Sequence, residues 1–192
     1  MSENEIPGAL AREFVIAGHG NLPRVKEMLL QNPELLNVSY PWSESDRETA
    51  IQGAAQVGNA PIAEFLLSSG APLDICTAAM LGRVEAVEGF LRNDPQLIRA
   101  KGAHGIPLLP HAALSGRPEL VSMLVKRGAT EGVAFALHNA ASRSHYDVAQ
   151  WLLDNVSPDL TWKDYRGKTA LETASERNDT RMEELLRKYN KA

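Results

Sequence analysis

Residues 112–128 read AALSGRPELVSMLVKRG, and variants of this stretch recur along the whole chain. A pair of small residues, two variable residues and usually a glycine precede an aliphatic run that ends at a second glycine. The apolar residues after Gly116 lie four, five, seven, eight and nine positions beyond it, which is the spacing of one helix face. Proline at the start and glycine at the end suit the first turn and the C-terminus of that helix. Each copy therefore predicts two short helices joined by a tight turn.

The small-residue motif at the start of this stretch occurs six times in the 192 residues. Small side chains at the paired positions let helices of neighbouring units pack closely. A chain of such units buries its core between neighbours and exposes long surfaces, so the repeat predicts an all-α solenoid and not a single globule. The six copies are Ile16-Ala17-Gly18-His19-Gly20, Ala54-Ala55-Gln56-Val57-Gly58, Ala78-Ala79-Met80-Leu81-Gly82, Ala112-Ala113-Leu114-Ser115-Gly116, Ala140-Ala141-Ser142-Arg143-Ser144 and Ala174-Ser175-Glu176-Arg177-Asn178.

These residues resemble the ankyrin repeat, whose pattern is TPLHxAAxxG followed by an aliphatic helix and Gly-Ala. The best local matches are ALHNAA at residues 136–141 and GKTALETA at residues 167–174. The resemblance covers about residues 8–190 and implies one ankyrin-repeat domain over residues 1–192. The expected helix-turn-helix units are approximately residues 8–37, 48–71, 74–99, 107–129, 133–159 and 168–190.

The spacing of the motifs alternates, because the closing positions after Gly20 follow at steps of 38, 24, 34, 28 and 34 residues. Alternating steps predict three doublets, with projecting β-hairpins after units one, three and five and none after units two and four. We call these projections the first, second and third fingers; they occupy residues 38–47, 100–105 and 161–167. The first is four residues longer than the others. An insertion of this kind costs little free energy, so its aromatic residues are candidates for contact with a partner.

Composition excludes several classes of function. The net charge of −4, with no cluster of basic residues, argues against nucleic-acid binding. The single cysteine, Cys76, excludes an internal disulfide and a cysteine-based zinc site, and is expected to be an inert packed thiol. No apolar stretch approaches the roughly 18 residues of a membrane span, and the N-terminus has no signal-peptide pattern. A cytoplasmic protein without membrane contact is expected.

In the ankyrin family, partners are usually bound by the finger tips and by the exposed face of each first helix. Carried over to this chain, these surfaces contain aromatic and aliphatic anchors and cations that would steer an acidic partner. The candidate partner-binding residues are Tyr40, Trp42, Arg47, Val57, Lys101, His104, Leu114, Arg143, Trp162, Lys163, Tyr165 and Arg166.

Packing is the competing interpretation for several apolar residues. Trp42 and Trp162 fit either binding or contact with neighbouring helices, and Met80 and Leu81 fit either an exposed groove or a core. Val57 and Leu114 are expected to be exposed. Five aromatic residues at core spacing are expected to be packing residues: Phe14, Phe65, Phe90, Phe135 and Trp151.

The histidines do not form a recognisable catalytic pattern. His138 occupies the structural histidine position of the ankyrin resemblance, and His111 is a candidate for groove exposure. The run Ser144-His145-Tyr146-Asp147 contains triad residue types, but a triad needs side chains from separated elements. No pair of histidines has a carboxylate at ligand spacing, so no metal, cofactor or catalytic site is expected.

The leading hypothesis is a non-catalytic module that presents a concave groove and fingers to an unidentified protein or peptide. One alternative is a homodimer in which a second copy covers the groove. A less favoured alternative is an enzyme or a ligand-binding regulatory subunit.

Overall fold

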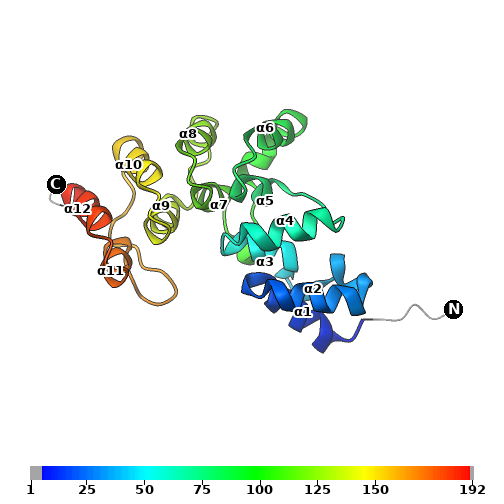
Figure 1. Ribbon diagram of the computed structural model, residues 1–192. Helices are drawn as coiled ribbons and strands as arrows, with labels where there is room; N and C mark the ends of the chain where they lie inside the picture. Colours follow the sequence, from blue (N-terminus) through cyan, green and yellow to red (C-terminus); the bar gives the residue numbers. More distant parts are fainter. Residues whose placement is uncertain (1–5, 191–192) are drawn as a thin grey trace.

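The computed structural model describes residues 6–190, which form a curved array of helix pairs (Figure 1). Within this range there are twelve α-helices, and consecutive helices pack on each other in six pairs. The first helices of successive pairs also stack on one another, as the solenoid prediction requires. The pairs are α1 (Gly8–Gly20) with α2 (Leu22–Gln31), α3 (Ala50–Gln56) with α4 (Ala60–Ser68), α5 (Ile75–Met80) with α6 (Val84–Asn93), α7 (Leu108–Leu114) with α8 (Pro118–Lys126), α9 (Val133–Ser142) with α10 (Tyr146–Asn155), and α11 (Ala170–Glu176) with α12 (Thr180–Tyr189).

The array is curved, and its two edges are made from different helices. In Figure 1 the second helices α6, α8 and α10 lie along the outer edge, while α7 and α9 lie toward the hollow side. None of the helices in the described part of the chain combines the length and apolar character needed to cross a membrane.

A residue with left-handed backbone holds the turn inside five of the six units. Gly58, Gly82 and Gly116 have φ angles of 69°, 67° and 72°, a region that a Cβ atom disfavours. Ser144 and Asn178 take the same place in units five and six, with φ angles of 56° and 55°. The turn therefore forms even where the glycine is replaced, which is why the two weakest motifs still give helix pairs.

Three fingers project where the spacing predicts them, and the first is a β-hairpin. Its strands β1 (Ser39–Pro41) and β2 (Arg47–Thr49) are antiparallel. The second strand leads directly into α3, whose N-terminus has a capping box. The Thr49 side chain accepts from the backbone N–H of Gln52, and the Gln52 side chain accepts from the backbone N–H of Thr49.

The second and third fingers are shorter, and neither contains a pair of strands among the residues described. The second has one antiparallel bridge, Lys101 with Pro107, around a 3₁₀ turn at Ala103–Gly105. Proline has no backbone N–H, which limits further pairing there. In the third, the backbone N–H of Asp164 donates to the carbonyl of Lys168 at 2.9 Å, so a turn closes the loop without strands.

The paired alanines of the motif lie in the core, in agreement with the sequence prediction. Eight of them are at most 1% exposed: Ala54, Ala55, Ala78, Ala79, Ala112, Ala113, Ala140 and Ala141. The core is divided into two clusters, one over units one and two and one over units three to six. Cys76 is buried, and this burial raises the pKa of its thiol to about 12, so it is the inert thiol expected.

The structure decides between the alternatives at Met80 and Leu81 in favour of packing. Met80 is buried and Leu81 is half-buried, and both contact the cluster of units one and two. The expected groove exposure of His111 is wrong, because its side chain is buried. The backbone of Gly102 covers the ring so closely that a Cβ on that glycine would come within 2.6 Å of the His111 Nε2 atom.

Four of the five predicted packing aromatics contact the core. Phe14 is fully buried, and Phe65, Phe90 and Trp151 are half-buried against their neighbours. Phe135 is the exception, because it lines the hollow side of the array.

Candidate functional site

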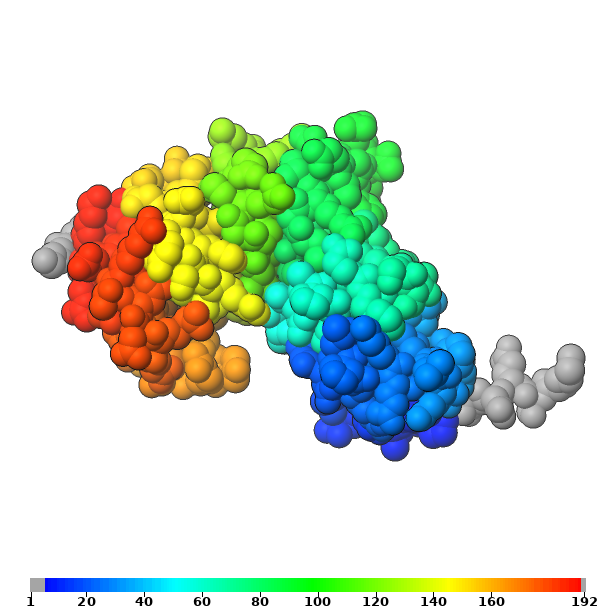
Figure 2. Space-filling model, in the orientation of Figure 1, coloured from blue at the N-terminus to red at the C-terminus, as the bar shows by residue number. Residues whose placement is uncertain are grey.

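A hollow of about 460 Å³ lies on the inner side of the curve, between the ends of α3, α7 and α9 and the third finger. We call it the concave groove; in Figure 2 the hollowed side lies between the cyan segment and the orange loop. Its lining comes from units two, four and five and from the second and third fingers. The lining residues are Gln56, Val57, Ile106, Leu114, Phe135, His138, Asn139, Ser142, Arg143, Trp162, Asp164, Tyr165 and Arg166.

One wall of the concave groove is aromatic. The rings of Phe135 and Trp162 are stacked, with centroids 5.2 Å apart and planes 22° from parallel. His138 meets Trp162 edge-on at 5.6 Å. The prediction that Phe135 is a core residue is therefore wrong, because the third finger folds back and presents Trp162 as its partner. For Trp162 the packing and binding interpretations hold together, since the half-buried ring contacts a neighbour and also lines the hollow.

The floor of the concave groove is aliphatic. Val57 at the end of α3 and Leu114 at the end of α7 are both half-buried and line the hollow. Gly58 lets these two units approach, because a Cβ there would lie 3.2 Å from Leu114. An aliphatic floor beside a stacked aromatic pair can bury an apolar side chain of a ligand.

Two arginines line the groove at its rim. Arg143 reaches from the end of α9 across to α3, where its guanidinium donates to the Val57 carbonyl. Arg166 on the third finger pairs with Asp164 at 3.0 Å and with Glu176 at 3.6 Å. Both side chains are exposed, so both guanidinium groups are accessible to an incoming carboxylate.

Asp164 holds the third finger against the array. Its Oδ1 atom accepts from the backbone N–H groups of Arg166 and Lys168, each at 2.9 Å. Burial acts to raise the pKa of Asp164, but the hydrogen bonds from Lys168 and Arg166 lower it overall, so the group is a carboxylate. His138 Nε2 lies 3.0 Å from the Thr173 hydroxyl and 3.5 Å from Asp164, and burial lowers the pKa of its imidazole.

Tyr165 occupies the tip of the third finger and is 97% exposed. No other aromatic residue in the described part of the chain appears among the exposed large hydrophobic residues. Its position beside the concave groove agrees with the prediction that the finger tips present aromatic side chains.

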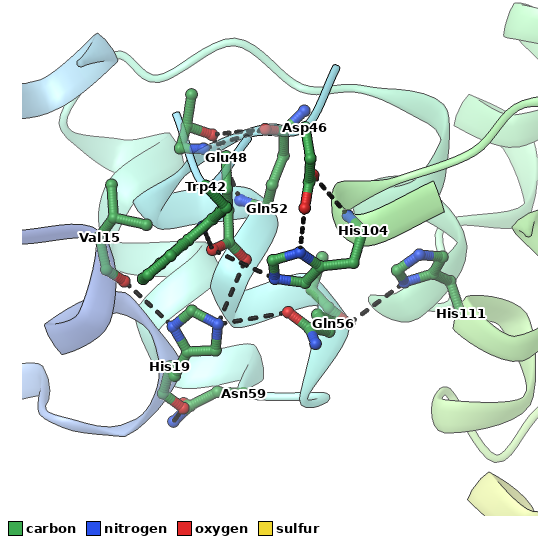
Figure 3. A network of polar contacts seen from close by, with 12 residues as sticks. Val15, His19, Trp42, Asp46, Glu48, Gln52, Gln56, Asn59, His104 and His111 are labelled. Carbon is green, nitrogen blue, oxygen red and sulfur yellow. Dashed lines mark hydrogen bonds and ion pairs between the residues drawn. The ribbon is translucent and has the colours of Figure 1, made fainter. Parts of the chain in front are cut away.

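A second polar cluster joins the first and second fingers to unit one (Figure 3). His19 Nε2 lies 3.2 Å from Glu48 Oε1, and His104 Nε2 lies 3.6 Å from Glu48 Oε2. We call His19, Glu48 and His104 the His–Glu cluster. The Glu48 carboxylate raises the pKa of His19, against the opposing effect of burial. The hydrogen bond from His104 lowers the pKa of Asp46.

Trp42 is held by this cluster, which favours the packing interpretation of its role. Its ring is half-buried, its Nε1 donates to Glu48 Oε2 at 2.7 Å, and Tyr40 meets it edge-on at 4.9 Å. The predicted partner-binding residue His104 is likewise bound internally, since its Nδ1 atom lies 2.6 Å from Asp46 Oδ2.

The remaining predicted binding residues lie apart from the groove. Arg47 donates to the hydroxyl and carbonyl oxygens of Ser39, and Lys101 pairs with Glu131 at 3.1 Å. Lys163 lies on the other side of the third finger. Six of the twelve predicted residues are thus brought together in the concave groove: Val57, Leu114, Arg143, Trp162, Tyr165 and Arg166.

Sequence reasoning missed Asp164 and Glu48, which organise the two sites. Each is a short-range acidic residue in a finger, with no motif around it. The alternation of strand β2 was the available signal for Glu48, because Arg47 is exposed and the next residue along a strand points inward.

The helix pairs, the left-handed turns and the buried alanines agree with one family. Residues 109–192 match the family description "Ankyrin repeats (3 copies)", and residues 46–78 match "Ankyrin repeat". The chain belongs to the ankyrin repeat family. Ankyrin repeats are generally protein–protein interaction modules and are typically non-enzymatic.

Two relatives are also named as ankyrin repeat proteins. One, from fowlpox virus (strain NVSL), is 33% identical over 103 residues, which are 50% of this chain and 23% of the relative. The other, from Rickettsia felis (strain ATCC VR-1525 / URRWXCal2), is 32% identical over 104 residues, which are 53% of this chain and 45% of the relative. The chain therefore matches less than half the length of either ankyrin repeat relative.

Proposed function

We propose that this ankyrin repeat protein binds an extended peptide segment of another protein in the concave groove. The observation that carries the proposal is the convergence of an aliphatic floor, an aromatic wall and two rim arginines on one hollow of about 460 Å³. These groups come from three separate parts of the chain. A groove of this composition suits a ligand with one apolar anchor and a few polar contacts.

Charge complementarity defines the peptide further. Arg143 and Arg166 border the groove, and Asp164 is already occupied by hydrogen bonds within the third finger. The preferred segment therefore has an aromatic or aliphatic residue next to an aspartate or glutamate. Surface charges of this kind increase the association rate more than the affinity, and salt screens them.

The test is selection from a displayed random-peptide library on the purified chain, followed by binding measurements on a selected synthetic peptide. We expect a consensus of an apolar residue beside an acidic one. The Leu114→Glu variant places a charge in the floor and should weaken binding at least about tenfold, a change of about 1.4 kcal/mol. The Arg143→Gln variant should reduce the preference for the acidic residue and the salt dependence.

Leu30→Glu is the matched control, because Leu30 is an 85% exposed leucine on α2, away from the groove. It should bind the peptide like the wild type. Equal losses for Leu30→Glu and Leu114→Glu would contradict the proposal. Light scattering examines the competing homodimer: a dimer that Leu114→Glu dissociates would assign the groove to a second copy.

A further inference from the structure

The His–Glu cluster is assembled from three units that are distant in sequence. His19 comes from the end of α1, Glu48 from strand β2 of the first finger, and His104 from the second finger. One nitrogen or oxygen atom from each residue lies within 4.8 Å of the other two. Figure 3 shows the two imidazole rings turned toward the Glu48 carboxylate.

The second nitrogen of each imidazole is already engaged. His19 Nδ1 lies 3.1 Å from the Val15 carbonyl, which can only accept a hydrogen bond, so Nδ1 donates. His104 Nδ1 lies 2.6 Å from the Asp46 carboxylate, which also accepts. In the neutral tautomers, both Nε2 atoms therefore carry lone pairs. Metal-bound histidines in proteins are oriented by hydrogen bonds of this type to a carbonyl or a carboxylate.

Those two lone pairs face a third acceptor. Glu48 has no exposed side-chain surface, and its Oε1 atom has no hydrogen-bond donor among residues 6–190. Its Oε2 atom accepts only from the Trp42 indole. A fully buried carboxylate opposed by two lone pairs is unfavourable unless a cation lies among them.

The donor set and its dimensions indicate the class of cation. Two imidazole nitrogens and one carboxylate oxygen suit Zn²⁺, whereas Mg²⁺ and Ca²⁺ prefer oxygen ligands. Metal–ligand bonds of about 2.0–2.2 Å place neighbouring donors of a tetrahedral site about 3.3 Å apart. The two observed donor separations, 3.2 Å and 3.6 Å, bracket that value.

We propose that His19, Glu48 and His104 bind a Zn²⁺ ion that joins the first and second fingers to unit one. The Glu48 and Asp46 carboxylates together balance its two positive charges. Both histidine side chains are about one-third exposed, so water can take the fourth position. The ion links three units of the array, and its role is to fix the fingers relative to α1.

The sequence gives no sign of this site because its ligands are 29 and 56 residues apart, from His19 to Glu48 and from Glu48 to His104. The expectation of no metal site considered only ligands close in sequence. A zinc site made by tertiary contact escapes that criterion.

The experiment uses the full chain without an affinity tag, freed of metal by a chelator and titrated with Zn²⁺ against a chromophoric competitor. We expect uptake of one Zn²⁺ per chain. Co²⁺ should bind at the same stoichiometry and give the intense visible absorption of a tetrahedral site. Binding of Zn²⁺ should raise the unfolding temperature in proportion to occupancy.

Three variants make the assignment specific. His104→Gln removes a partly exposed ligand and should weaken Zn²⁺ binding at least about 100-fold. Asp46→Asn leaves all three ligands in place and should weaken binding about 10–100-fold, the usual effect of losing an outer partner. His145→Gln is the control, because the Nε2 atom of His145 contacts the Leu114 carbonyl outside the cluster. It should bind Zn²⁺ like the wild type.

Circular dichroism verifies that each variant is folded before its affinity is compared. Failure of the wild type to take up one equivalent of Zn²⁺ would overturn the assignment. An affinity of His104→Gln equal to that of the wild type would do the same. Equal weakening by His104→Gln and His145→Gln would assign the uptake to other histidines.

Discussion

At the scale of single residues, close approach between units depends on the absence of a side chain at particular positions. Gly18 in α1 lies against α3, and a Cβ there would come within 2.5 Å of the Ala50 carbonyl oxygen. Gly89 in α6 has nothing within 4 Å of the same position. The two helical glycines therefore have opposite roles, which the sequence alone does not distinguish.

Gly18→Ala should destabilise the protein by about 1–3 kcal/mol, because the backbone of α3 must shift to accept the methyl group. Gly89→Ala should stabilise it by about 0.5–1 kcal/mol, because alanine loses less backbone entropy in a helix. Urea unfolding of both variants measures the two changes. Equal effects of the same sign would show that the α1–α3 contact is not tight.

His111 should make stability depend on pH. Burial lowers the pKa of its imidazole below the usual value of 6.5, so the unfolded chain takes up a proton at a pH where the folded chain does not. The free energy of unfolding should therefore fall as the pH drops below about 6.5. The stability difference between the wild type and His111→Gln should shrink from about pH 7.5 to about pH 5.5. A difference that stays constant or grows would show that His111 is protonated in the folded state.

At the scale of elements, the helix pairs could be predicted from the sequence, whereas the construction of the fingers could not. Helix positions follow from the local spacing of apolar residues around Gly58 and Gly116, which needs no tertiary information. The third finger instead depends on hydrogen bonds to one carboxylate, Asp164. The groove was predicted in part, because Val57 and Leu114 were placed by repeat position, but the stacking of Phe135 on Trp162 depends on how that finger folds back.

Asp164→Ala should loosen the third finger without unfolding the helices. The backbone N–H groups of Arg166 and Lys168 would lose their acceptor, so their hydrogen exchange should become at least about tenfold faster. The affinity for the selected peptide should fall, because Trp162 is no longer held beside the groove. Asp154→Ala, on an exposed turn of α10, is the control and should change neither quantity. Unchanged exchange in Asp164→Ala would show that the finger is held by other contacts.

At the scale of the whole molecule, the core consists of two clusters linked through unit three. Met80 belongs to α5 but packs with the cluster of units one and two. Because repeat arrays are stabilised by contacts between neighbouring units, such a residue couples the two halves.

Met80→Ala should cost about 2–5 kcal/mol and should uncouple the halves, so that α1–α4 exchange their amide protons ahead of α7–α12 in moderate urea. The wild type should show the two sets exchanging together. Met123→Ala on α8, within the second cluster only, serves as the control and should leave them coupled. Separate exchange of the halves in the wild type would contradict the linking role of Met80.

The central claim is that the concave groove is the surface that binds the partner. Chemical-shift mapping by NMR with the selected peptide tests it most directly. The account predicts that the perturbed amides are those of Val57, Leu114 and Arg143 and of residues 162–166 in the third finger. Perturbations confined to the outer helices α6, α8 and α10 would contradict it.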